Sequence, residues 1–313
     1  MVRDRRIKLN QHNSIYLVLV VLCLSAFLYS PRFFRIENIN LMLRQTAALG
    51  ILTLGHVFVI SCGCVDLSLT ATIQMSIAML MVVVKSYGEG LLIVGLLLSL
   101  VVTLAIGLIN GLIVAKFHVQ PFLSTLFIGS IITGVRKVAT GVTPLGTPPK
   151  IIIDLVKGGS VLSYSNFWLL LAAVVAYVVL NKTVFGRQTM MVGTNSAAAM
   201  FSGIRTSRVV IASYCISAFS AMIAGIVSIG YLGFADQTSI GNGMEMSSLV
   251  AAVLGGNLLS GGRASVSGAL GGAVAMTLML NIVILFGLEI QYQHVLRGVV
   301  LLAVVILSAQ LRK

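Results

Sequence analysis

Four side chains that could coordinate a soft metal ion lie close together in the sequence: His56, Cys62, Cys64 and Asp66. In a helix, Cys62 and Asp66 would share a face because they are four residues apart, whereas His56 would lie roughly 240° around the axis from Cys62. Cys64 would point in yet another direction. The spacing therefore argues against a metal centre, and we predict that the chain binds neither a metal ion nor a cofactor.

Asp66 is unusual in any case, because a carboxylate flanked by apolar segments is costly in lipid unless water, backbone N–H groups or a basic partner compensate it. It could line the path of a solute, or it could cap a helix that begins near Leu67. The order Asp66, Leu67, Ser68 directly before an apolar run favours the cap. A membrane-embedded hydrolase would need a second acid or a nucleophile–base pair, and the sequence offers Asp66 no such partner.

The segments around these residues are apolar, since 58% of the 313 residues are hydrophobic, 9% are charged and the mean hydropathy is +1.05. Soluble domains are about 45–50% apolar and about 25% charged, so lipid must surround most of this chain. At roughly 20 residues per span, we predict an all-α polytopic membrane protein with about ten transmembrane helices, some broken, and both termini cytoplasmic. The predicted spans are residues 15–29, 47–62, 69–85, 91–115, 119–136, 167–181, 209–230, 246–259, 265–288 and 295–311.

The net charge of +13 does not indicate a nucleic-acid-binding protein, because the basic residues are scattered singly between apolar runs. They fit the preference of basic residues for the cytoplasmic ends of spans. The longest polar stretches, residues 141–166 and 181–208, are too short to fold alone, so we expect one domain over residues 1–313. The sequence contains no G-x-x-x-x-G-K-[ST] loop, so it lacks an ATP-binding site of that kind.

The hydrophilic segment of residues 182–208 contains four basic residues and no acid, which places it in the cytoplasm. Asn195 is a good N-cap for a short helix over residues 196–202, and Gly203 can adopt the left-handed conformation that ends it. Two isolated helical turns are unstable in water. The segment must therefore rest either on the ends of the chain's own helices or on a partner protein.

Polar residues inside the predicted spans must face the interior of the bundle or a wet cavity. Gln74, Asn110 and Asn281 are such residues, and their amides offer donors and acceptors without a fixed charge. A neutral, hydroxyl-rich solute needs this combination, so the three residues are candidates for a solute pathway. Hydrogen bonding between helices is the alternative. Two G-x-x-x-G pairs, at 107–111 and 268–272, predict close helix packing.

Five motifs follow one another along the chain: Val65-Asp-Leu-Ser68, Asn110-Gly-Leu-Ile-Val-Ala-Lys116, Val119-Gln-Pro-Phe122, the run from Phe185 to Ile204, and Ala251 to Gly268. Together they resemble the ribose-type membrane permeases of bacterial ABC importers over nearly the whole chain. The resemblance implies that residues 182–208 form a coupling loop that docks on cytosolic ABC ATPase subunits. It assigns coupling to Gly186, Arg187, Asn195, Ala198, Ala199, Ser202 and Gly203, and a structural signature to Asp66, Ser68, Gly255, Gly256, Gly261 and Gly262.

The same resemblance implies the other components of an importer. A solute-binding protein would deliver a small hydrophilic solute, such as ribose, at the outer face of the bacterial cytoplasmic (inner) membrane. A second permease chain would complete a homodimer or a heterodimer, and the chain itself would be a transport subunit and not an enzyme. A furanosyl signalling molecule or a nucleoside is an alternative solute. A non-ABC channel or secondary transporter is less favoured, because the spans lack a convincing coupling acid.

The sequence departs from the family pattern at three places. Cys64 stands where a second glycine is usual, Thr70 where another glycine is common, and Ser196-Ala197 where an acidic pair is frequent. Acids in the first turn of a helix are favoured by the helix dipole and could meet basic residues of an ATPase. Their absence is consistent with pairing to a different permease chain that supplies them.

Overall fold

The computed structural model describes residues 33–141, 145–158, 163–236, 239–289 and 291–310. In these ranges every regular element is helical, apart from one isolated bridge between Gly146 and Ala235. The predicted all-α, polytopic fold is thereby confirmed. The α-helices are α2 (Ile36–Ser61), α3 (Leu69–Tyr87), α4 (Leu92–Phe117), α5 (Pro121–Thr140), α6 (Lys150–Lys157), α7 (Ser165–Lys182), α8 (Val184–Thr194), α9 (Ser196–Phe201), α10 (Thr206–Leu232), α11 (Met244–Leu254), α12 (Val266–Leu285) and α13 (Tyr292–Gln310).

Seven helices in the described part of the chain are long and apolar enough to cross a membrane: α2, α3, α4 with the short turn before it, α5, α7, α10 and α12. Each predicted span from residue 47 onward falls on a helix, and the span predicted at residues 15–29 lies outside the described residues. The expected number of about ten also included α11 and α13. With 11 residues, α11 is too short to cross a bilayer alone, as predicted for a broken helix.

α2 begins at Ile36, well before residue 47, although polar residues interrupt the apolar pattern there. One of them, Asn38, exchanges two amide hydrogen bonds with Asn281 of α12, with Nδ2 to Oδ1 distances of 2.9 and 3.2 Å. Because this pairing satisfies polar groups inside the bundle, the helix continues through a stretch that hydropathy alone assigns to a connection.

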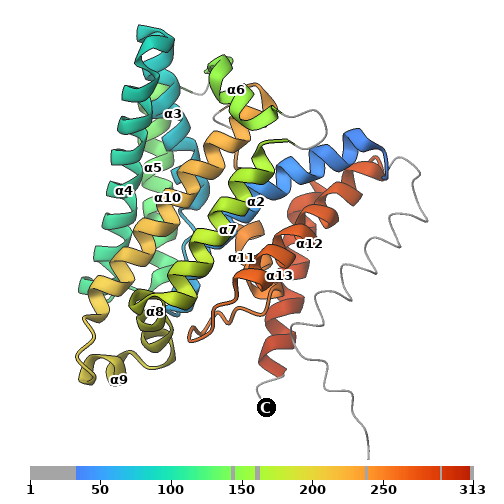
Figure 1. Ribbon diagram of the computed structural model, residues 1–313. Helices are drawn as coiled ribbons and strands as arrows, with labels where there is room; N and C mark the ends of the chain where they lie inside the picture. The colour runs from blue at the N-terminus through green and yellow to red at the C-terminus, as the bar shows by residue number, and fades with distance from the viewer. Residues whose placement is uncertain (1–32, 142–144, 159–162, 237–238, 290, 311–313) are drawn as a thin grey trace, which may run out of the picture.

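α10 and α2 form the centre of the bundle, where α10 packs against α2, α3 and α4, and α2 also packs against α7 and α12 (Figure 1). Two glycines bring α4 close to α10. A Cβ at Gly107 would lie 2.8 Å from the Tyr214 carbonyl oxygen, and one at Gly111 would lie 2.7 Å from Ile211 Cα. The close packing predicted for this pair is confirmed. In contrast to α2, the helices α4, α5 and α7 expose large apolar side chains, as contact with lipid requires.

α2 and α11 both end in non-helical connections, residues 62–68 and the glycine-rich residues 255–265, near the end of the bundle that carries α8 and α9 (Figure 1). The two connections are in main-chain contact. Gly262 N donates a hydrogen bond to Ser61 O at 3.0 Å, and a Cβ at Gly261 would lie 2.6 Å from Gly63 N. The two interrupted helices are thus joined directly to each other.

Both predicted helix breaks are present. α2 ends at Ser61 as expected, and α11 ends at Leu254, earlier than the predicted Leu259. At Gly255 the main chain of Gly268 in α12 comes so close that a Cβ would overlap it. The packing role predicted for the second G-x-x-x-G pair is confirmed, and the connection after α11 lies directly against α12.

Candidate functional site

The predicted short helix is present as α9, and its ends have the expected caps. Asn195 is the N-cap, and its Oδ1 accepts a hydrogen bond from Ala198 N at 3.0 Å. Gly203 has a left-handed φ of +80°, and its N–H donates to Met200 O at 3.0 Å. The predicted helix over residues 196–202 is confirmed, with its last helical residue at Phe201.

Sequence reasoning missed α8, which immediately precedes α9. Its cap was available as a signal, since Thr183 Oγ1 accepts a hydrogen bond from Gly186 N at 3.3 Å. Gly186 and Gly193 lower the helix propensity of the segment, but both lie against main chain. A Cβ at Gly186 would overlap the Leu180 carbonyl oxygen, and one at Gly193 would overlap the Ser61 carbonyl oxygen. Tertiary contact therefore overrides local propensity here.

The surface of α9 combines exposed apolar and basic side chains. Phe201 is 87% exposed and Met200 is 58% exposed. Arg187 of α8 and Arg205, which precedes α10, are exposed as well. We call these four residues the α9 surface. Sequence reasoning did not select Met200 or Phe201, although an apolar pair in a hydrophilic segment could have drawn attention to them.

The predicted coupling residues divide into an exposed and a buried group. The exposed residues are Arg187, Asn195, Ala198, Ser202 and Gly203, and the buried ones are Gly186 and Ala199. Exposed residues are free to meet a partner. Ala199 instead packs in an apolar cluster with Cys62, Val192 and Tyr214, so it holds α9 on the bundle.

Asp66 lies at the centre of a buried hydrogen-bonded cluster between four helices. Its Oδ1 accepts hydrogen bonds from Ser68 N at 3.1 Å and Ser68 Oγ at 2.6 Å, and its Oδ2 accepts one from Ser217 Oγ of α10 at 3.1 Å. Asn110 Nδ2 of α4 donates to Ser68 Oγ at 2.9 Å, and Asp66 N donates to His56 Nε2 of α2 at 3.2 Å. We call these five residues the Asp66 cluster. They join α2, α4 and α10 to the start of α3.

The prediction that Asp66 caps a helix beginning near Leu67 is wrong. α3 begins at Leu69, and its N-cap is Ser68, whose side chain makes no capping hydrogen bond. The carboxylate of Asp66 instead accepts a hydrogen bond from the N–H of Ser68, the residue before the helix. It accepts another from the hydroxyl of Ser217, which is distant in the sequence. Residues 62–68 are not helical, so Cys62 and Asp66 do not share a helical face either.

Both ring nitrogens of His56 are occupied. Nε2 accepts the hydrogen bond from Asp66 N, so we assign the ring proton to Nδ1, which lies 2.9 Å from Ser248 Oγ of α11. Ser248 Oγ donates in turn to Glu245 O. His56 therefore connects α2 to α11. Within the described ranges, no group of three or more His, Cys, Asp or Glu side chains could hold a metal ion.

The three amides predicted to contact a solute are buried on different helices. Gln74 Nε2 of α3 donates to Ile240 O at 3.2 Å, Asn110 of α4 belongs to the Asp66 cluster, and Asn281 of α12 pairs with Asn38 of α2. Each amide joins two segments, and none of the three lines either of the two cavities described below. Their part in a solute pathway stays a prediction.

An open cavity of about 440 Å³ lies between α3, α5 and α11, beside the connection that carries Asp66. Its polar lining comes from Thr70, Ser130, Thr133 and Glu245. Thr70 Oγ1 donates to Gly241 O at 2.7 Å and also lies against the Glu245 carboxylate. We call this cavity the α3–α5 groove. Sequence reasoning noted Thr70 only as a departure from a family pattern and selected none of the others.

The four predicted signature glycines all lie in the connection of residues 255–265. Gly256, Gly261 and Gly262 have φ values of +82°, +81° and +80°, which side chains rarely adopt. A Cβ at Gly261 would also lie 2.7 Å from Gly193 Cα of α8. α8 is therefore in main-chain contact with both interrupted helices, at Ser61 and at Gly261.

Residues 38–305 match the protein family described as branched-chain amino acid transport system / permease component. The chain is 32% identical over 296 residues to the ribose import permease protein RbsC of Bacillus subtilis, covering 94% of this chain and 91% of that protein. It is 27% identical over 330 residues to the galactose/methyl galactoside import permease protein MglC of Haemophilus influenzae, covering 99% and 98%. The L-arabinose ABC transporter permease protein AraH of Azospirillum brasilense is 28% identical over 302 residues, covering 96% and 88%. No solved structure matches significantly.

Proposed function

This chain belongs to the branched-chain amino acid transport system / permease component family, and on this premise we propose that it carries a simple sugar such as ribose into the cytoplasm. It is a multi-pass membrane protein and the permease component of an ABC sugar importer, not itself an enzyme. ATP hydrolysis then takes place on separate cytosolic subunits. We place their docking site at the α9 surface.

The α9 surface is the observation that carries the proposal. Fully burying a Phe or Met side chain is worth about 1.5–3 kcal/mol, so Met200 and Phe201 favour a partner that covers them. Arg187 and Arg205 beside them favour acidic residues on that partner. An ATPase subunit seated there would also meet the exposed coupling residues predicted from the sequence.

α8 supplies a route by which motion of the ATPase subunits reaches the bundle. Gly193 lies against Ser61 at the end of α2 and against Gly261 in the connection after α11. Because main-chain atoms are in contact there, a displacement of α8 and α9 has no flexible side chain to absorb it. We infer that closure of the ATPase subunits moves residues 62–68 and 255–265 together and so changes access to the α3–α5 groove.

The α3–α5 groove supports a sugar as the solute. The hydroxyls of Ser130 and Thr133 can both donate and accept hydrogen bonds, and the Glu245 carboxylate can accept them, which suits a neutral polyol. Relatives named for ribose, galactose and arabinose make a pentose or hexose the first choice. A nucleoside, a furanosyl signalling molecule and a non-ABC carrier are the alternatives. The three predicted amides would reach a solute only after their present hydrogen bonds open.

The complete importer would contain three further kinds of protein. Cytosolic ABC ATPase subunits would bind the α9 surface, a periplasmic or extracellular solute-binding protein would deliver sugar at the opposite end, and a second permease chain would pair with this one. That second chain could be identical or different. Residues 1–313 would act together as one permease domain, with residues 182–208 as its coupling loop.

Expression together with the neighbouring genes tests the proposed function. The chain is isolated by an affinity tag, the proteins that copurify are identified, and uptake of labelled ribose into proteoliposomes is measured with and without ATP. We expect an ATP-hydrolysing subunit to copurify and uptake to depend on ATP. Full-rate accumulation without an ATPase would contradict the proposal, and a preference for a nucleoside over ribose would replace the proposed solute.

Phe201→Ser tests the α9 surface. Loss of the aromatic ring should weaken binding of the ATPase subunit about tenfold, while membrane insertion is unchanged because the ring is exposed in this chain. Phe167→Ser is a matched control, since Phe167 is 59% exposed but lies in the first turn of α7, which starts at the other end of the bundle (Figure 1). Equal loss of ATPase binding in both variants would rule out a specific contact at α9.

A further inference from the structure

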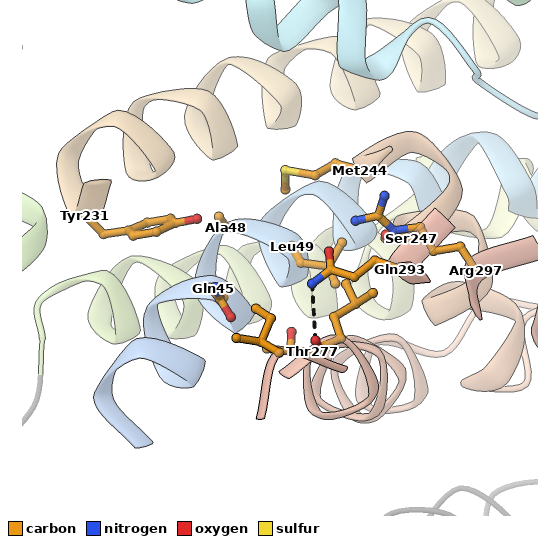
Figure 2. A pocket seen from close by; sticks show the side chains of 11 residues that line it. Gln45, Ala48, Leu49, Tyr231, Met244, Ser247, Thr277, Gln293 and Arg297 are labelled. Atoms are coloured by element: carbon orange, nitrogen blue, oxygen red, sulfur yellow. Dashed lines mark hydrogen bonds between the residues drawn. The ribbon is translucent and has the colours of Figure 1, made fainter. Parts of the chain in front are cut away.

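A second cavity, of about 130 Å³, lies between α2, α10, α11, α12 and α13, and Figure 2 shows its lining side chains. α10 begins beside α9 and reaches this cavity at Tyr231, close to its other end. The cavity therefore lies far from the α9 surface. Its other polar lining residues are Gln45, Ser247, Thr277, Gln293 and Arg297, and no acid from the described part of the chain lines it. We call it the Arg297 cavity.

Arg297 is buried in this cavity without a full set of hydrogen-bond acceptors. It is 8% exposed, and its Nη1 makes two long hydrogen bonds, of 3.4 Å to Asn242 O and 3.4 Å to His294 Nδ1. Its buried Nε has no partner. A guanidinium carries five N–H donors and stays charged, so a site of low dielectric requires an acceptor for it. Glu245, in the first turn of α11, interacts electrostatically with Arg297, but no hydrogen bond joins the two side chains in the described part of the chain, and the Glu245 carboxylate lies against Thr70 Oγ1.

The surroundings of Arg297 add positive potential and one further unused group. A Cβ at Gly243, the N-cap of α11, would overlap Arg297 Nη1, so the guanidinium lies against the start of that helix. A helix N-terminus carries a partial positive charge, which adds to the charge of Arg297. Thr277 is 3% exposed, and its Oγ1 has no hydrogen-bond partner. The cavity thus offers a cation, a helix N-terminus and a free hydroxyl.

We propose that the Arg297 cavity binds a small carboxylate, up to the size of a short hydroxy acid. The carboxylate lies beside Arg297 Nε, on an edge of the guanidinium that can donate two parallel hydrogen bonds. The ligand hydroxyl bonds to Thr277 Oγ1, which has no other partner, while Gln293 Nε2 stays bonded to Leu280 O at 3.2 Å (dashed line in Figure 2).

The size of the cavity limits the ligand. A volume of about 130 Å³ equals about four water molecules at about 30 Å³ each, which accommodates acetate or lactate but not a nucleotide. Leu49, Met244 and Ile284 supply apolar contacts for the ligand's carbon atoms. The cavity is separate from the α3–α5 groove, so this inference does not rest on the proposed transport of sugar.

Thermal unfolding of the full purified chain in detergent tests the proposal without any ATPase. Lactate and acetate are titrated at constant ionic strength against sodium chloride, glycerol and ribose. We expect lactate to raise the melting temperature by about 2 °C in a saturable way, with acetate weaker because it lacks the hydroxyl. Chloride and glycerol should give no saturable shift. An equal shift with chloride, glycerol or ribose would overturn the proposal.

Two pairs of variants locate the binding. Arg297→Gln should abolish the lactate response, whereas Arg35→Gln, which removes an exposed charge at the start of α2, should keep it. Thr277→Val should raise the half-saturating lactate concentration about tenfold. Thr103→Val is its matched control, since Thr103 also has a buried hydroxyl without a partner but lies on α4, outside the cavity.

The second pair decides the question even if Arg297→Gln does not fold. An undiminished lactate response in Thr277→Val, or an equal loss in Thr103→Val, would overturn the proposed site. A normal lactate response in a chain that fails to transport sugar would leave this site standing and contradict only the proposed function.

Discussion

The α9 surface and the Asp66 cluster belong to the same end of the bundle, but their hydrogen bonds join residues at different separations in the sequence. Asn195, which caps α9, bonds to Ala198 three residues later, and Gly203 closes the same short segment. Asp66 bonds instead to Ser217, on a helix distant in sequence. Local hydrogen bonds shape a segment that can move as a unit, whereas long-range ones hold the helices around it. In the proposed coupling mechanism, the comparison separates the segment that moves from the helices that hold it in place.

Asp66→Ala should have the largest effect, and it tests the supporting role. The substitution leaves the buried donors of Ser68 and Ser217 unpaired, so we expect a loss of about 3 kcal/mol in unfolding free energy. Thermal unfolding in detergent measures it, with Asp154→Ala on the exposed face of α6 as the control. A normal melting temperature together with abolished uptake would indicate that Asp66 lines the solute path. It would contradict the supporting role that the comparison assigns to Asp66.

Gly203→Val should have an intermediate effect, confined to the moving part. Valine disfavours a φ of +80° by about 1–2 kcal/mol, so the end of α9 shifts and ATPase binding falls about tenfold. The melting temperature should fall only slightly, because the strain is confined to the end of α9 and no atom lies within 4 Å of a Cβ at this position. Gly134→Val, at an equally open position in α5 without a positive φ, is the control. Unchanged copurification of the ATPase would argue against the coupling role.

Asn195→Ala should have the smallest effect. Loss of the N-cap costs about 1 kcal/mol within α9, so ATPase binding should weaken about fivefold while the melting temperature stays the same. Asn195→Ser keeps a capping oxygen and should restore binding, measured by the same pull-down. If the serine variant is as defective as the alanine variant, Asn195 contacts the partner directly and does more than shape the helix.

The features that depend on neighbouring residues could be predicted from the sequence. Apolar runs marked the spans, and the order of Asn195, Ser196 and Gly203 marked α9 with both of its caps. Features that depend on distant contacts could not be predicted. α8 forms around Gly186 and Gly193 because other segments lie against them, and single-sequence propensity counts both glycines against a helix.

The same limit explains the errors in the candidate site. Asp66 precedes an apolar run as a cap would, and only the folded chain reveals Ser217 as its partner. The α3–α5 groove unites Thr70 with Ser130 and Glu245 from three separate helices, a combination without any sequence pattern. In the sequence, Arg297 is an isolated charge near the edge of a predicted span, and only the folded structure shows the cavity that it lines.

The junction of Ser61, Gly193 and Gly262 has a consequence for energy use. Because Gly262 N bonds to Ser61 O and a Cβ at Gly193 would overlap both residues, one added methyl group would act as a wedge. Such a wedge would part α8 from the interrupted helices and leave the docking face intact. According to the proposed function, the ATPase subunits would then hydrolyse ATP in a futile cycle, without transport of the solute.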